Sequence, residues 1–206
     1  MQTKSWKNGT VSDIEFDSEF LGDIVRVRLL RHAIRMYEMN KRQGTHNTKG
    51  RSDLHFRREA LFKQKGTGRA RVRHASATQC RHGAVAHGPH PRDYSYQMPR
   101  RSKTEALRSA LLAKFRDGEV TLAADLGVTQ AKTKPMAQML GKLGYQKSCV
   151  IVVGERDDNL LLACRNLRRI VVVPASEVNA WHLLHYKNAI ITEEAIGQLR
   201  ERTRES

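Results

Sequence analysis

The chain has 206 residues with 37 Lys and Arg against 21 Asp and Glu, so it is long enough for a domain with a buried core and carries a formal net charge of +16. Its hydrophobic fraction of 39% is too high for a wholly disordered chain, and it has no apolar run long enough to cross a membrane. The chain has three widely spaced cysteines, which argues against a disulfide framework. Its first twenty residues contain four carboxylates, which argues against a secretory signal. The net positive charge predicts a polyanionic partner.

The N-terminal part predicts one edge strand and one helix. Residues Val11–Phe16 could add an edge strand to a sheet. Gly22 and Asp23 could then cap a helix with an apolar face and a charged face. The expected apolar face consists of Val27, Leu30, Ile34 and Tyr37.

Positive charge is concentrated in the next part of the chain. Residues 41–108 carry 17 basic and 4 acidic groups, whereas residues 1–40 carry 6 of each and residues 109–206 carry 14 and 11. Residues 41–101 show no sustained apolar period of 3.6 or 2, and glycine and proline interrupt them. We therefore expect a long basic loop that orders against its partner.

The remaining residues predict alternating helices and strands. Ser102–Glu105 has the pattern of a capping box, and Asp117–Gly118 should end the helix that it opens. Strands are expected at 120–123, 148–153, 169–173 and 189–191, with helices over 136–143, 160–162 and 178–184 and after Thr192. This order predicts a single α/β domain over 1–206, with a mostly parallel sheet, helices on both faces and one long basic extended loop interrupting it.

The stretch Phe62–Arg73 is the most basic motif. It places five cations around Gly66 and Gly68, which would let the backbone approach phosphate closely. RNA contact is the favoured interpretation. A mononucleotide site and a solvated basic linker are the alternatives, because the stretch matches no phosphate-binding motif and no strand precedes it.

A second motif ends the loop. Tyr94 and Tyr96 beside Arg92 offer stacking surfaces for bases, or else pack back onto the folded part of the chain. The series Cys80, His82, His87 and His90 contains metal-ligand residue types, but its spacing differs from that of structural zinc sites. We favour histidines near phosphate and expect no metal and no other cofactor.

Catalytic patterns are sparse. Asp157 and Asp158 follow Gly154 where an α/β fold could hold a ligand, but a loop and helix cap is the favoured interpretation. No Ser or Cys stands in a nucleophile motif. The rival hypothesis is an α/β RNA-modifying enzyme with a basic RNA-guiding arm, whose cofactor turn would be Val153–Glu155.

Four motifs in order resemble the family of bacterial-type large ribosomal subunit protein four. They are Arg42–Lys49, Lys63–Arg71, Gly88–Tyr96 and Ala106–Leu111. The resemblance implies a structural, non-enzymatic protein in which an α/β body binds large-subunit rRNA and residues 43–100 form an rRNA-penetrating loop. It also implies a tip formed by Gln64, Lys65, Gly66, Thr67, Gly68 and Arg69 at the nascent-peptide exit tunnel, beside large-subunit protein twenty-two.

From this resemblance and the charge pattern we expect a set of rRNA-binding residues along the loop and at the start of the following helix. The set is Arg42, Gln43, Lys49, Arg51, Lys63, Lys65, Arg69, Arg71, Arg73, Arg81, Arg92, Tyr94, Tyr96, Arg100, Arg101 and Arg108. We expect a cytoplasmic location on the ribosome, a role in assembly and translation, and neither a membrane partner nor a small-molecule substrate.

Overall fold

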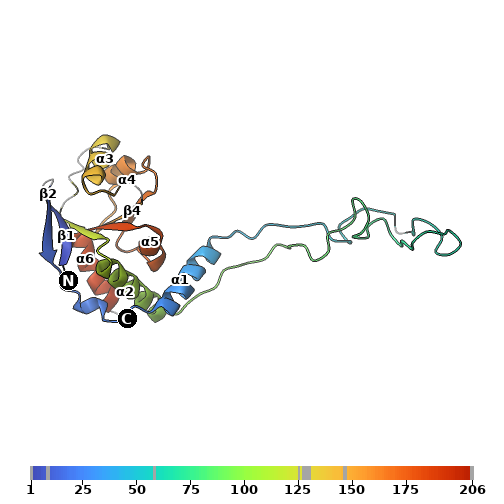
Figure 1. Ribbon diagram of the computed structural model, residues 1–206, viewed down its shortest axis with the longest axis horizontal. Helices are drawn as coiled ribbons and strands as arrows, with labels where there is room; N and C mark the ends of the chain where they lie inside the picture. Colours follow the sequence, from blue (N-terminus) through green and yellow to red (C-terminus); the bar gives the residue numbers. More distant parts are fainter. Residues whose placement is uncertain are drawn as a thin grey trace. The chain divides into compact units, whose positions relative to one another are not determined.

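A six-stranded sheet in the order β2-β1-β3-β6-β4-β5 organises the fold (Figure 1). The structure, a computed structural model, describes residues 2–7, 10–57, 59–124, 126, 131–145 and 148–204. The strands are β1 (Gln2–Lys7), β2 (Thr10–Glu15), β3 (Val120–Ala123), β4 (Cys149–Val153), β5 (Ile170–Pro174) and β6 (Asn188–Thr192). β1 and β2 form an antiparallel hairpin, and the other neighbouring strands pair in parallel.

Apolar side chains project from both faces of this sheet, because its central strands are apolar at consecutive positions. In β4, Val150 and Val152 join one core, and Cys149, Ile151 and Val153 join the other. The first core also contains residues of η1 (Glu19–Leu21), α1 (Val27–Asn40), α2 (Arg100–Arg116), α5 (Ala180–His185) and α6 (Glu193–Arg204). The second contains residues of α3 (Thr133–Lys142) and α4 (Asp158–Cys164). The expected α/β class with a mostly parallel sheet is confirmed.

Three local predictions were wrong. Gly22 does not cap α1, because it is the C-cap of η1 and α1 begins only at Val27. Ser102–Glu105 is not a capping box, since α2 already begins at Arg100 directly after Pro99. Proline disfavours helical backbone in the residue before it, so the helix starts just beyond it. Val27 does not belong to the buried face of α1, because it is 63% exposed, whereas Leu30, Ala33 and Met36 are buried.

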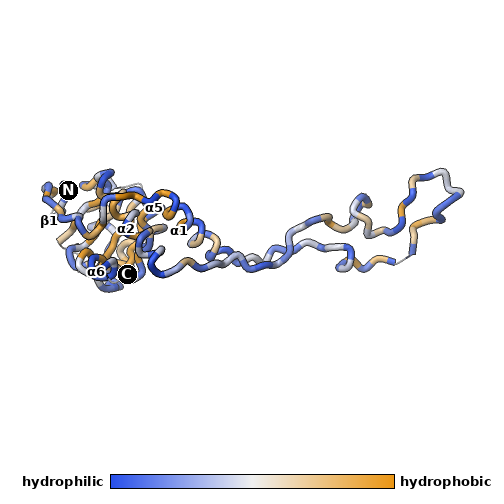
Figure 2. Tube along the Cα trace, turned by 90° about the horizontal axis from the view of Figure 1, so that it is seen from below, coloured by the Kyte–Doolittle hydropathy of each residue, from blue (hydrophilic) through white to orange (hydrophobic). Residues whose placement is uncertain are grey.

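The chain divides into two compact units. One comprises residues 1–38 and 96–206 and is called the body here; the other, residues 39–95, is called the loop unit. In Figure 2 the hydrophobic residues gather in the helices and strands of the body. No described helix combines the length and the apolar character that a bilayer span requires. Penetration of rRNA by residues 43–100 stays a prediction.

Candidate nucleic-acid interface

The loop unit carries far more positive than negative charge. It contains 13 Lys and Arg and only 3 Asp and Glu. Asp53 accepts a hydrogen bond from the Gly50 N–H (2.8 Å), and Glu59 pairs with Arg57 (3.3 Å). The N–H and hydroxyl of Ser95 both donate to Asp93 and hold the pKa of its carboxyl below the ordinary value. These local contacts leave most of the cationic charge of the unit without a carboxylate to balance it.

Two arms of the loop unit run side by side and are joined by backbone hydrogen bonds (Figure 1). Thr48 N–H donates to the Pro89 carbonyl (3.1 Å), and Arg92 N–H donates to the Gly44 carbonyl (3.2 Å). Gly44 has a positive φ of 73°, and a Cβ there would lie 2.0 Å from the Arg92 carbonyl oxygen. Only glycine allows this approach of the two arms.

Tyr94 holds the arms together with its ring. The guanidinium carbons of Arg42 and Arg92 lie over this ring, 4.1 and 4.2 Å from its centroid. The Tyr94 hydroxyl also hydrogen bonds with His46 Nε2 (3.1 Å). Cation–π contacts of this kind stabilise a pair of arms that have no apolar core of their own. Tyr94 is therefore already engaged within the loop unit, and its contact with rRNA stays a prediction.

Tyr96 lies in the body. Its hydroxyl donates to the His32 carbonyl of α1 (3.2 Å), while 37% of the residue stays exposed. Of the two interpretations given to the tyrosine pair, Tyr96 follows the packing alternative. Tyr94 does not follow the packing alternative, since its partners Arg42, His46 and Arg92 all belong to the loop unit.

Residues 74–84 form a cluster of tight turns. Cys80 N–H donates to the Ala77 carbonyl (2.9 Å), and Ala84 N–H donates to the Ser76 carbonyl (3.1 Å). The Cys80 thiol points to the His74 carbonyl (3.8 Å). Within the described part of the chain, no three His, Cys, Asp or Glu side chains meet in an arrangement that could hold a metal ion.

The expected tip has the backbone of a sharp turn. Gly66 and Gly68 have positive φ values of 79° and 62°, and both have open space around them. The side chains from Lys63 to Arg69 are exposed. The other expected rRNA-binding residues of the loop unit, Gln43, Lys49, Arg51, Arg71, Arg73, Arg81 and the Tyr94-bound Arg42 and Arg92, are exposed as well.

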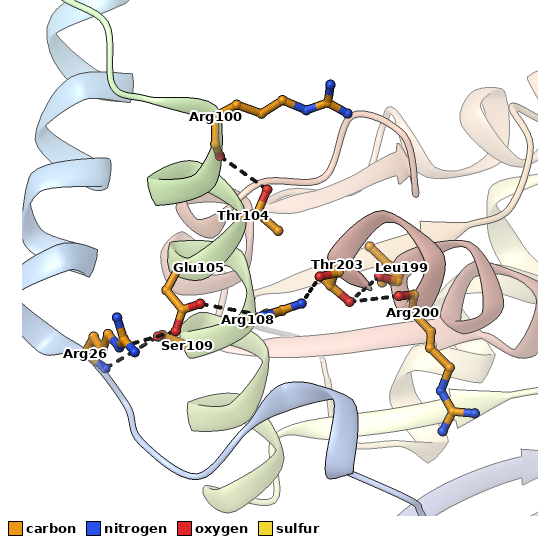
Figure 3. A network of polar contacts seen from close by, with 9 residues as sticks. All are labelled: Arg26, Arg100, Thr104, Glu105, Arg108, Ser109, Leu199, Arg200 and Thr203. Carbon is orange, nitrogen blue, oxygen red and sulfur yellow. Dashed lines mark hydrogen bonds and ion pairs between the residues drawn. The ribbon is translucent and has the colours of Figure 1, made fainter. Parts of the chain in front are cut away.

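The three expected arginines of α2 have different surroundings. Arg100 and Arg101 are exposed at the start of the helix. Arg108 lies in an internal network, where it pairs with Glu105 (3.7 Å) and donates to the Thr203 carbonyl near the end of α6 (Figure 3). Glu105 also pairs with Arg26 (3.3 Å). A cation at a helix C-terminus is favourable, so this network ties α2 to α6.

Replacing Arg108 separates its structural role from the expected rRNA contact. We expect Arg108→Gln to lower the free energy of unfolding by about 1–2 kcal/mol, because two contacts of a side chain that is only 26% exposed are lost. The salt dependence of RNA binding should stay unchanged. Thermal unfolding and a salt titration measure both quantities.

The matched control for this variant is Arg101→Gln on the exposed part of the same helix. For this control we expect an unchanged free energy of unfolding and a weaker salt dependence of RNA binding. If Arg108→Gln lowered the magnitude of the salt slope by about 1 and left the free energy of unfolding unchanged, Arg108 would contact an rRNA phosphate directly.

The turn after β4 has the geometry of a helix cap. Asp157 accepts a hydrogen bond from Asn159 N–H (2.9 Å) at the start of α4, and Arg156 pairs with Asp158 (3.2 Å). The Asp157 carboxylate thus satisfies a helix N–H that has no intrahelical partner. This geometry is the loop and cap that the sequence favoured over a cofactor turn.

Comparison with known proteins identifies the family. Residues 14–202 match the model of the Ribosomal protein L4/L1 family. The chain belongs to this family. It is 40% identical over 194 residues to large ribosomal subunit protein uL4 of Solibacter usitatus (strain Ellin6076), which covers 94% of this chain and 93% of that protein. It is 37% identical over 195 residues to the uL4 protein of Thermoanaerobacter sp. (strain X514), over 95% of this chain and 94% of that protein.

Membership of the L4/L1 family confirms the resemblance seen in the four sequence motifs. The family is one of structural ribosomal proteins, so the expectation that the chain is not an enzyme is also confirmed. The hypothesis of an RNA-modifying enzyme is set aside on this ground.

Proposed function

We propose that this chain is a structural component of the large ribosomal subunit and binds large-subunit rRNA mainly through the loop unit. The observation that carries the proposal is the excess of 13 cations over 3 locally engaged carboxylates in that unit. Cations in such excess bind a polyanion by neutralising phosphates and releasing counterions. The bacterial relatives named as large-subunit proteins support a site of action on a cytoplasmic ribosome.

The loop unit is suited to a contact that forms during assembly. Its arms are joined by the contacts of Arg42 and Arg92 with the Tyr94 ring and by a few backbone hydrogen bonds. A segment held by so few contacts gains most of its order from its partner, and phosphate contacts then supply the free energy. In this proposal Gln64–Arg69 form the tip at the nascent-peptide exit tunnel, beside large-subunit protein twenty-two. The open turn at Gly66 and Gly68 supports a tip at this position.

Sedimentation of a cell lysate tests the ribosomal role. We expect the protein to travel with the large subunit through a sucrose gradient and to stay there after a high-salt wash, because a loop threaded into rRNA cannot leave by charge screening alone. Immunoblotting of the fractions measures this. Protein at the top of the gradient at both salt concentrations would overturn the proposal.

Salt dependence tests the phosphate contacts. If six cations of the loop unit meet phosphates, the logarithm of the binding constant should fall with the logarithm of salt concentration with a slope of about −4 to −5. Filter binding of the full chain to large-subunit rRNA over a salt series measures the slope. A flat response would contradict phosphate-dominated binding.

A further inference from the structure

The loop unit contains a cavity of about 380 Å³ that the proposed function does not yet use. Three separate segments of the unit line it. The lining residues that matter here are Arg51, Phe62, Gln64, Arg71, Arg73 and Gln79. All of them belong to the loop unit, so the cavity lies within one compact part of the chain.

The charge of the cavity favours an anion. Arg51, Arg71 and Arg73 are exposed, and no carboxylate stands among the residues that line the cavity. The two acidic groups nearest in sequence are engaged elsewhere, Asp53 with the Gly50 N–H and Glu59 with Arg57. Guanidinium groups bind phosphate oxygens through paired N–H donors, so three of them around one hollow favour a phosphate group.

The rest of the lining suits a planar base. Phe62 is half-buried in the wall, and Val72 adds a second apolar side chain. The side-chain amides of Gln64 and Gln79 can each donate and accept hydrogen bonds, as the edge of a base requires. The volume lies in the range of small-molecule sites and is far too small for a double helix. Single-stranded RNA is recognised in this way, by stacking unpaired bases on aromatic rings.

We propose that this cavity receives one unstacked nucleotide of a single-stranded RNA segment. The base lies against Phe62, and its phosphate lies among Arg51, Arg71 and Arg73. The inference rests on the proposed rRNA binding and adds to it a specific nucleotide site. Because residues 51, 62 and 71–79 come from three parts of the loop unit, the bound nucleotide also fixes these parts against one another.

Two RNA probes test the site. A single-stranded uridylate octamer and an RNA duplex with the same number of phosphates are titrated against the full chain at one salt concentration. We expect the wild-type chain to bind the single strand more tightly than the duplex, since only the former can insert a base. Phe62→Ala should weaken single-strand binding about tenfold and leave duplex binding unchanged.

Two further variants make the result specific. Leu61→Ala is the matched control, because Leu61 is the preceding residue, is 56% exposed and does not line the cavity; we expect wild-type affinity. Phe62→Tyr retains an aromatic ring and should restore single-strand binding. Unchanged duplex binding by Phe62→Ala excludes misfolding as the cause of its loss of single-strand binding. Photo-crosslinking of an octamer that contains 5-iodouridine should yield a peptide that includes Phe62.

The outcomes separate the site from the function on which it rests. Equal affinities of Phe62→Ala and Leu61→Ala for the single strand, or a wild-type preference for the duplex, would overturn the nucleotide site while rRNA binding stands. Failure of the wild-type chain to bind large-subunit rRNA would overturn the proposed function and the site together.

Discussion

Replacing Gln43–Ser95 by a short glycine–serine linker should abolish most rRNA affinity and leave the body folded. The replacement removes 11 of the 37 Lys and Arg residues. We expect the affinity for large-subunit rRNA to fall roughly 100-fold or more at physiological salt, with a much flatter salt dependence. The linker ends before Tyr96 and Arg100 because Tyr96 donates to α1 and Arg100 begins α2. Filter binding measures the affinity, and circular dichroism follows the fold.

The control removes charge from the body instead. Arg165→Gln with Arg168→Gln deletes two exposed cations from the connection between α4 and β5. We expect this double variant to bind rRNA nearly as well as the wild type. The loop-centred account fails if the linker variant binds with undiminished affinity, or if the double variant loses as much.

Glu119→Gln should lower the stability of the body more than any exposed ion-pair change. Lys114 is only 6% exposed, and its ammonium group pairs with Glu119 and donates to the Lys187 carbonyl (2.6 Å). Replacement of the carboxylate by an amide leaves the buried ammonium group without its counter-charge. Because Glu119 itself is partly exposed, we expect a loss of about 2 kcal/mol, or roughly 4–8 °C in Tm.

An exposed ion pair provides the comparison for this variant. Lys7 pairs with Glu193 at 3.6 Å, and both side chains are more than half exposed. Lys7→Gln should therefore change the free energy of unfolding by less than about 0.5 kcal/mol. Equal losses in Lys7→Gln and Glu119→Gln, measured by thermal unfolding, would show that burial of Lys114 does not set the strength of its ion pair.

The parallel strands of the body could be predicted because their composition is decisive. Val150–Val153 and the stretch ending at Val173 are runs of β-branched residues with helical patterns between them, and the structure places β4 and β5 there. Gly118 was expected to end a helix, and it has a positive φ value just after α2. In these places the local pattern and the tertiary structure agree.

Strand β1 had no local pattern strong enough to predict it. Five of its six residues are polar, and two of them, Thr3 and Ser5, are buried between β2 and β3. Its pairing with β3 joins residues more than a hundred positions apart. A hydroxyl-rich segment becomes a strand here because it pairs with β2 on one side and with the distant β3 on the other.

Contacts between residues distant in sequence also limited what could be predicted for the candidate interface. The charge pattern indicated a cationic segment, and the structure shows most of its cations exposed. The engagement of Tyr94 by Arg42 and of Arg108 by Thr203 depends on contacts across 52 and 95 positions. The one local sign of the first contact was Gly44, whose positive φ and close approach to Arg92 allow the arms to meet.

The position of β6 in the sheet bears on how the protein is made. This strand is the last to be synthesised, yet it lies between β3 and β4. Residues up to 192 must therefore emerge from the ribosome before β6 can join β3 to β4 in the sheet. By then residues 39–95 have long emerged. The nascent protein thus exposes its cationic segment to cellular RNA before its own fold is complete.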